Sequence, residues 1–186
     1  MSGARPERLP GSVGEIHHVA ISVRDLERSI PFYRDGLGLR MTLEAKVGND
    51  TMPERLRVPE GTTGRIVYFQ GPTRIGQIEL IQWNLPAPPD SRPKRPGDPG
   101  VFALSMPVPA DEIHIVYERL VAMGVECYAP PATSVIDDYG PITMFMCEDP
   151  DGIQIEVISL PSTEEVRAFR AARRAKAAQD GGQERS

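Results

Sequence analysis

The 186-residue sequence has little of the material on which several classes of protein depend. It contains two cysteines, three histidines and one tryptophan, and it has no run of 18 apolar residues. Two cysteines without a metal-type spacing cannot build a disulfide framework, so Cys127 and Cys147 are interpreted as reduced thiols of the core. Without a long apolar run, no segment is expected to span a membrane.

Basic charge is also scarce, because 21 Lys and Arg face 26 Asp and Glu and give a net charge of −5. Phosphate binding needs a concentrated basic face, so nucleic acid is not expected as a partner. Residues 1–14 lack the apolar core of a secretory signal, and a cytoplasmic location is expected. An apolar fraction of 40% is enough for a packed core, which argues against a disordered chain.

An internal repeat organises the sequence. Gln-Ile-Glu-Leu-Ile at 77–81 recurs as Gln-Ile-Glu-Val-Ile at 154–158, at an offset of 77 residues. At the same offset, Val-Tyr-Phe at 67–69 matches Met-Phe-Met at 144–146. Repetition on this scale predicts two copies of one structural unit.

Prolines separate the two copies, since six of them lie between Asn84 and Gly100. Such a segment can continue neither a helix nor a strand ladder, which predicts an extended surface connector. The expected organisation is a flexible tail (1–14), a first module (15–83), a proline-rich linker (84–99), a second module (100–161), and a C-terminal helix with a disordered tail (162–186).

Each module is expected to contain a strand, a helix and three further strands. The predicted strands are 16–23, 39–45, 65–70 and 76–83 in the first module, and 101–108, 125–128, 141–147 and 152–160 in the second. The helices should begin near Asp25, where Pro31 should bend the first one, and near Asp111. Ser162 and Glu165 form a capping-box sequence for the last helix. The fold class is therefore α+β, with two βαβββ modules forming a curled mixed sheet around a cleft.

Strand alternation gathers polar side chains on the sheet faces turned away from the helices. These side chains are His18, Gln77, Glu79, Gln154 and Glu156. A glutamate in an apolar strand is costly to bury unless it is paired or bound to a cation. The pattern therefore predicts a divalent metal site, whereas His17 should point the other way and is interpreted as structural.

Two segments are similar to a known family. They are Ile16–Leu39, which reads IHHVAISVRDLERSIPFYRDGLGL, and Glu148–Val157, which reads EDPDGIQIEV. They resemble the opening module and the second-module ending of the vicinal oxygen chelate superfamily. That group includes glyoxalase I, methylmalonyl-CoA epimerase, extradiol dioxygenases, and the fosfomycin and bleomycin resistance proteins. The resemblance covers about residues 15–160 and implies the same two-module plan.

The resemblance also implies metal ligands on the first and fourth strands of each module. In this sequence they are His18, Glu79 and Glu156, which would hold Zn, Ni, Co, Mn or Fe. The fourth position falls on Phe102 or Ala103, and neither side chain can bind a metal.

The function implied is that of a metal-dependent lyase or isomerase with glyoxalase- or epimerase-like proton transfer. Glu156 or Glu79 would move the proton on a small carbonyl, hydroxy or acid substrate. Gln77, Gln154 and Tyr139 are expected to line the substrate site. One alternative is a non-catalytic binding or resistance protein. A ring-cleaving dioxygenase is disfavoured, because the second histidine is absent. A homodimer is implied by the resemblance.

Overall fold

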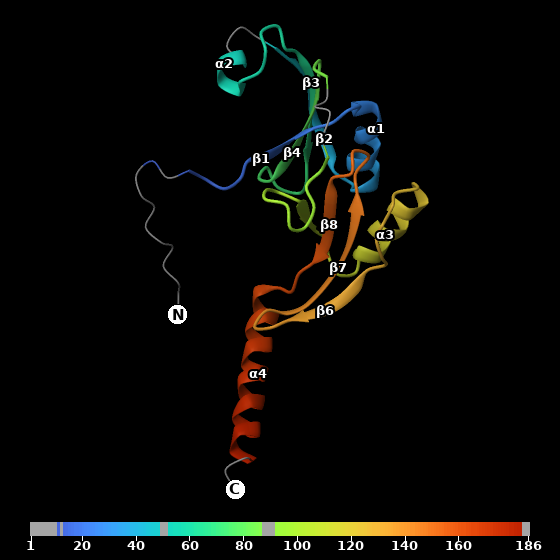
Figure 1. The fold of residues 1–186 in the computed structure, drawn as a ribbon. Coiled ribbons are helices and arrows are strands. Elements are labelled where there is room, and N and C mark those ends of the chain that lie inside the picture. Colours follow the sequence, from blue (N-terminus) through green and yellow to red (C-terminus); the bar gives the residue numbers. More distant parts are fainter. Residues whose placement is uncertain (1–10, 12, 49–51, 87–91, 184–186) are drawn as a thin grey trace. The chain divides into compact units, whose positions relative to one another are not determined.

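The computed structural model describes residues 11, 13–48, 52–86 and 92–183, and the chain divides into two compact units (Figure 1). The first unit runs from Met1 to Ala87 and the second from Pro88 to Ser186. Most of the expected N-terminal tail, the linker residues 87–91 and the last residues, 184–186, lie outside the described part. No helix among the described residues has the length and apolar character needed to cross a bilayer.

The first unit is a four-stranded sheet with helical segments in the β1–β2 and β2–β3 connections. In sheet order its strands are β1 (His18–Ser22), β4 (Gln77–Trp83), β3 (Gly64–Gln70) and β2 (Arg40–Val47). β1 runs parallel to β4, and the other neighbours are antiparallel. The helical segments are α1 (Leu26–Pro31), the π-helix η1 (Phe32–Gly36) and the short α2 (Met52–Leu56).

The first helix begins and changes form where the sequence predicts. The side chain of Asp25 caps it by accepting a hydrogen bond from the backbone N–H of Glu27 at 2.9 Å. Pro31 has no N–H to continue the α-helical ladder, and the chain goes on as the π-helix η1. The ring of Tyr33 is fully buried and stacks on Phe69 of β3, which ties this helical segment to the sheet.

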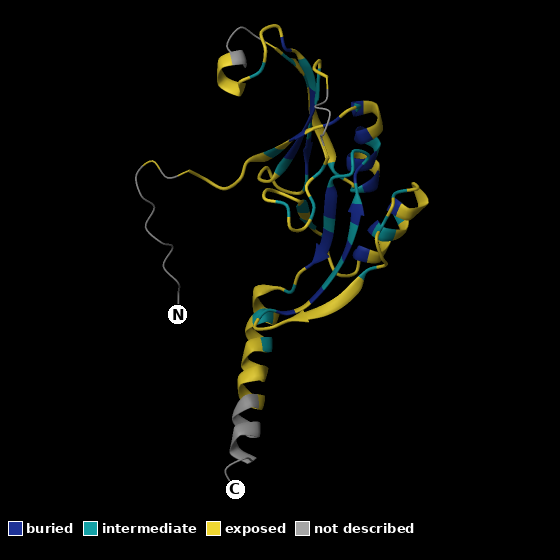
Figure 2. Ribbon diagram, viewed as in Figure 1, coloured by how far each residue is buried: buried dark blue, intermediate teal, exposed yellow. Residues whose placement is uncertain are grey.

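The second unit repeats the first. In sheet order its strands are β5 (Ala103–Pro107), β8 (Gln154–Ser159), β7 (Gly140–Glu148) and β6 (Ala132–Ile136). The helix α3 (Ile113–Ala122) packs on β7 and β8, and α4 (Thr163–Gln183) follows the sheet. Buried residues concentrate in the central strands, whereas β6 and the described side chains of α4 are largely exposed (Figure 2). The predicted α+β class with two βαβββ modules is confirmed.

One predicted strand is wrong. Residues 125–128 contain only an isolated bridge between Cys127 and Cys147, and the strand that pairs with β7 is β6. All five residues of β6 are exposed. The segment therefore lacks the alternation of apolar and polar residues by which a half-buried strand is recognised.

The offset between the repeated strands β3 and β7 also differs by one residue from the predicted value. Glu79 pairs with Tyr68, and Glu156 pairs with Met146, so equivalent positions of β3 and β7 differ by 78 residues. Sequence matching gave 77, because both strands carry consecutive apolar residues. A shift of one residue moves every side chain to the other face of a sheet, so the register decides which residues correspond.

The predicted capping box of the last helix is confirmed. The N–H of Glu165 donates to Ser162 Oγ at 3.2 Å, and the N–H of Ser162 donates to Glu165 Oε2 at 2.7 Å. α4 contacts β7, and Arg173 forms ion pairs with Asp137 and Asp138 at 3.1 and 3.4 Å. The helix is thus attached to the turn between β6 and β7.

We expect the two cysteines to differ in reactivity. Cys147 is fully buried, and burial followed by the charges around it raises the pKa of its thiol to about 12. Cys127 is only partly buried, and burial raises its pKa as well. Because the thiolate is the reactive form, iodoacetamide should label Cys127 slowly and leave Cys147 unlabelled in the folded protein. Peptide mass spectrometry measures this, with urea-unfolded protein, in which both should react, as the control. Equal labelling of the two in the folded state would contradict it.

Candidate functional site

A histidine and a glutamate meet on the face of the first sheet that is turned away from α1. His18 begins β1 and Glu79 lies in the parallel strand β4, where His18 stands opposite Gln77. Residues two apart on a strand share a face, so both side chains project to the same side. His18 Nε2 lies 3.3 Å from Glu79 Oε2, and Glu79 is buried with 9% of its surface exposed. The structure therefore brings together the two residues of the first module that were predicted as metal ligands.

Tyr68, on β3, flanks the same carboxylate. Its hydroxyl donates a hydrogen bond to Glu79, and its ring lies edge-on to His18 with centroids 5.6 Å apart. Burial, and then the hydrogen bond to Glu79 and its negative charge, raise the pKa of Tyr68 to about 12. The phenol is therefore a hydrogen-bond donor at neutral pH. Sequence analysis missed it, although assigning the faces of β3 as was done for β4 would have found it.

The chemistry of the His18–Glu79 pair fits one side of a metal site. An imidazole nitrogen and a carboxylate oxygen are ligands that Zn and other first-row divalent ions accept. Within the described part of either unit, no three His, Cys, Asp or Glu side chains form a group that could hold a metal ion. The first unit could thus supply two ligands, and a complete site would require others.

Strand registers identify Ala103 as the counterpart of His18. In the second unit Ala103 stands opposite Gln154, just as His18 stands opposite Gln77 in the first. Of the two positions that sequence analysis left open, the register therefore selects Ala103 over Phe102. A methyl side chain has no metal-binding atom, so the second unit offers no histidine at this position.

Glu156 lies in the central strand β8, between Ser105 of β5 and Met146 of β7. It is partly exposed, whereas its counterpart in the first unit is buried. Met146 occupies the position that Tyr68 holds in the first unit, so no phenol flanks this carboxylate from β7. The two glutamates of the repeat consequently lie in different surroundings.

His17 belongs to the His18 cluster, although alternation predicts that it points away. The Nδ1 atoms of His17 and His18 are 2.9 Å apart, and the rings meet edge to face with centroids 5.2 Å apart. His17 Nε2 lies 3.2 Å from Gln77 Nε2, which also donates to the carbonyl oxygen of Arg74 at 3.2 Å. β1 begins at His18, so His17 precedes the pleat that fixes alternation.

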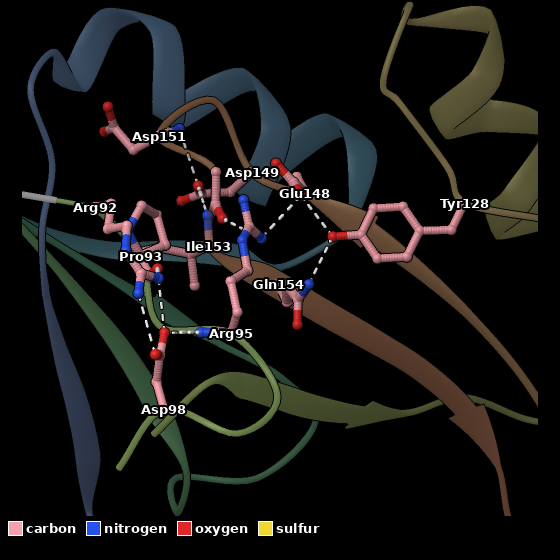
Figure 3. A network of polar contacts seen from close by, with 11 residues as sticks. Arg92, Pro93, Arg95, Asp98, Tyr128, Glu148, Asp149, Asp151, Ile153 and Gln154 are labelled. Atoms are coloured by element: carbon pink, nitrogen blue, oxygen red, sulfur yellow. Dashed lines mark hydrogen bonds and ion pairs between the residues drawn. The ribbon is translucent and has the colours of Figure 1, made fainter. Parts of the chain in front are cut away.

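Gln154, one of the two substrate-site residues predicted in the second unit, is held in a polar network (Figure 3). Its Nε2 donates to the hydroxyl of Tyr128 at 2.7 Å, and that hydroxyl donates to Glu148. Glu148 in turn forms an ion pair with Arg95 at 2.9 Å. Burial is the main cause that raises the pKa of Tyr128. Gln154 is 6% exposed, and its Oε1 has no hydrogen-bond partner among the described residues.

The described end of the proline-rich connector is part of this network and contains a turn, in which the N–H of Asp98 donates to the carbonyl oxygen of Arg95 at 2.9 Å. Asp98 forms an ion pair with Arg92 at 2.6 Å and accepts a hydrogen bond from the backbone N–H of Arg95 at 2.9 Å. The hydrogen bond from Arg92 is the larger cause that lowers the pKa of Asp98 to about 2. Arg95 then attaches the turn to Glu148 of β7.

Tyr139 is not brought to Gln154. It lies in the turn that joins β6 to β7, where its N–H donates to the carbonyl oxygen of Ile136 at 3.1 Å. Gln154 pairs with Glu148 at the other end of β7, which has nine residues. At about 3.3 Å per residue, the two positions are roughly 30 Å apart. Tyr128, which sequence analysis did not select, is the tyrosine that contacts Gln154.

Comparison with known proteins finds one matching family and relatives that are similar over most of the chain. Residues 15–157 match the model of the glyoxalase/bleomycin resistance protein/dioxygenase superfamily. The chain is 31% identical over 161 residues to an Actinomyces protein named 2-epi-5-epi-valiolone epimerase. The aligned region covers 83% of each chain. It is 28% identical over 159 residues to a lactoylglutathione lyase-like protein of Aspergillus terreus, and this aligned region covers 78% of this chain and 75% of that protein.

Solved structures with low sequence identity share the fold. A glyoxalase family protein from Bacillus cereus has a TM-score of 0.67 and 18% identity, and the match covers 86% of this chain and all of that one. A glyoxalase/dioxygenase from Nostoc punctiforme has a TM-score of 0.58 and 20% identity, and the match covers 86% of this chain and 99% of that one.

Proposed function

Because the chain belongs to the glyoxalase/bleomycin resistance protein/dioxygenase superfamily, we propose that it is a metal-dependent lyase or isomerase that transfers a proton on a small carbonyl, hydroxy or acid substrate. The observation that carries this proposal is the buried carboxylate of Glu79 beside His18 Nε2. Burying a carboxylate costs free energy of folding. A role in binding a cation or moving a proton would explain why this carboxylate is buried.

The proposed ligands are His18 and Glu79 of the first unit and Glu156 of the second. A bound divalent ion would supply Lewis-acid stabilisation of negative charge on the substrate oxygens. Glu79 or Glu156 would hold the migrating proton. Tyr68 would keep the Glu79 carboxylate oriented, since its phenol stays protonated at neutral pH. Gln77 and Gln154 would contact the substrate.

The names of the relatives support proton-transfer chemistry. One relative is named an epimerase and another a lactoylglutathione lyase-like protein. An epimerase that works through an enolate-like intermediate and a lyase of the glyoxalase kind both remove and return a proton next to a carbonyl group.

The proposal also includes a cytoplasmic location and a homodimer. Light scattering on the purified protein measures whether it is a dimer.

A second candidate function is the binding of a small molecule without turnover. The presence of Ala103 at the position equivalent to His18 favours it, because an incomplete ligand set is expected in a protein that has no catalytic ion. Binding of a ligand or ion without proton exchange would distinguish this function from the first.

Metal content tests the proposal. Untagged protein stripped with a chelator and dialysed against Mn, Fe, Co, Ni or Zn should retain about one ion per chain by mass spectrometry. Glu156→Ala should lose that ion because one carboxylate ligand is removed. Glu118→Ala, an exposed carboxylate of α3, is the matched control and should keep it. A wild-type protein that retains none of the five ions contradicts the metal-dependent function.

A further inference from the structure

A directed chain of polar contacts leads from a backbone carbonyl to Glu79, and it fixes where the proton of His18 resides. We propose that Gln77 and His17 are positioning residues that hold His18 in the tautomer protonated on Nε2, the nitrogen that faces Glu79. The consequence for metal affinity rests on the proposed function, whereas the tautomer itself does not.

The chain starts at the carbonyl oxygen of Arg74, which can only accept a hydrogen bond. Gln77 faces this oxygen through Nε2 at 3.2 Å, and the same Nε2 lies 3.2 Å from His17 Nε2. An amide rotated by half a turn would place Gln77 Oε1 against the carbonyl oxygen. The amide is therefore fixed as a donor on both sides, and His17 Nε2 must be an acceptor.

The tautomer of each histidine follows in turn. A neutral imidazole has one N–H and one acceptor nitrogen, so His17, which accepts at Nε2, carries its proton on Nδ1. That proton is directed at His18 Nδ1, 2.9 Å away. His18 Nδ1 is then the acceptor, and the proton of His18 resides on Nε2, 3.3 Å from Glu79 Oε2.

This arrangement opposes a metal ion at His18 Nε2, because a neutral histidine binds a metal through its unprotonated nitrogen. Moving the proton of His18 to Nδ1 would set it against the N–H of His17. Moving the proton of His17 to Nε2 would set it against the N–H of Gln77. Metal binding must break one contact of the chain, so removing His17 or Gln77 should strengthen binding.

The direction of this effect separates the proposal from an ordinary supporting role. A residue that merely steadies a metal-binding histidine lowers metal affinity about 10- to 100-fold when it is removed. Here the loss of one hydrogen-bond partner should raise the affinity for Co²⁺ about 3- to 10-fold, the range that one hydrogen bond spans. The same variants should release His18 from a single tautomer.

The experiment compares the wild type with His17→Phe and Gln77→Met, which keep side-chain size but remove the contacts. Long-range ¹H–¹⁵N spectra of metal-free protein at pH 8.5 report the tautomer of His18, assigned with His18→Gln. Calorimetric titration with Co²⁺ reports affinity. His114→Phe, a substitution of an exposed histidine on α3, is the matched control and should change neither readout.

An Nε2–H tautomer in the wild type, a mixture in both variants and tighter Co²⁺ binding would support the proposal. An Nδ1–H tautomer in the wild type, or weaker binding in the variants, would overturn it. If the tautomers behave as expected but no form of the protein binds Co²⁺, the positioning role stands and the metal-dependent function fails.

Discussion

Replacing Glu79 by glutamine is expected to remove both the bound ion and the proton transfer. The substitution keeps the shape of the side chain and its capacity to accept a hydrogen bond from Tyr68, but it removes the charge next to His18. Loss of a general acid or base typically slows a reaction about 10²- to 10⁴-fold, and loss of a metal ligand adds to this. Incorporation of deuterium from heavy water next to the carbonyl of small 2-hydroxy ketones measures the rate.

The matched control for Glu79→Gln is Glu44→Gln on β2. Glu44 is exposed and pairs with Arg65 at 2.7 Å, so its charge belongs to an ion pair that includes none of the proposed site residues. Exchange and metal content should match the wild type in this variant. Thermal stability should change little in Glu79→Gln, because a buried charge is replaced by a neutral group that keeps its partner. Full activity in Glu79→Gln would exclude Glu79 from the chemistry.

Truncating Phe69 to alanine should destabilise the first unit by about 3–5 kcal/mol. Phe69 is fully buried and stacks on Tyr33, so the substitution leaves a cavity between β3 and the helical segment. The single tryptophan, Trp83, lies on β4 of the same unit, where its Nε1 donates to Ser22 Oγ at 3.1 Å. Its fluorescence in a urea titration therefore reports unfolding of the first unit, whereas far-UV circular dichroism reports both.

The control for this prediction is Phe145→Ala, the same kind of truncation in the core of the second unit, where Phe145 of β7 is buried against Tyr117 of α3. If the units unfold separately, Phe69→Ala lowers the fluorescence midpoint and leaves the second dichroism step in place, and Phe145→Ala does the reverse. Equal shifts of both signals in both variants would show instead that the two units unfold as one.

Strand pattern and repeat were sufficient to predict most of the fold, because the central strands β4 and β8 are short, largely buried apolar runs that recur in the two units. They failed at β6, which has no buried residue, and in the register of β3, where a run of apolar side chains hides a shift of one position. Both failures have the same physical origin, since periodicity carries information only where one face is buried and the other is wet.

The candidate site was predicted only in part, because some of its residues lie on strands and others lie outside them. His18 and Glu79 sit on regular strands, so alternation placed them together. His17 and Arg95 lie outside strands, where neither spacing nor periodicity tells which partner a side chain will meet. Tyr128 follows Cys127, whose bridge to Cys147 is isolated, and it reaches Gln154 only through the fold. Contacts made from loops and connectors depend on tertiary structure, which a single sequence does not display.

The isolated bridge between Cys127 and Cys147 places the two cysteines of the sequence side by side. The backbone hydrogen bonds on either side run from Tyr128 to Met146 and from Glu148 to Glu126, so the cysteines form a non-hydrogen-bonded pair. Such pairs hold their Cα atoms about 4.5 Å apart, within the span of a covalent sulfur–sulfur crosslink. Distance therefore does not keep these thiols reduced. Burial raises the pKa of both thiols, so the reactive thiolate is scarce and oxidation is slowed, and prolonged exposure to peroxide would close a covalent loop around β6.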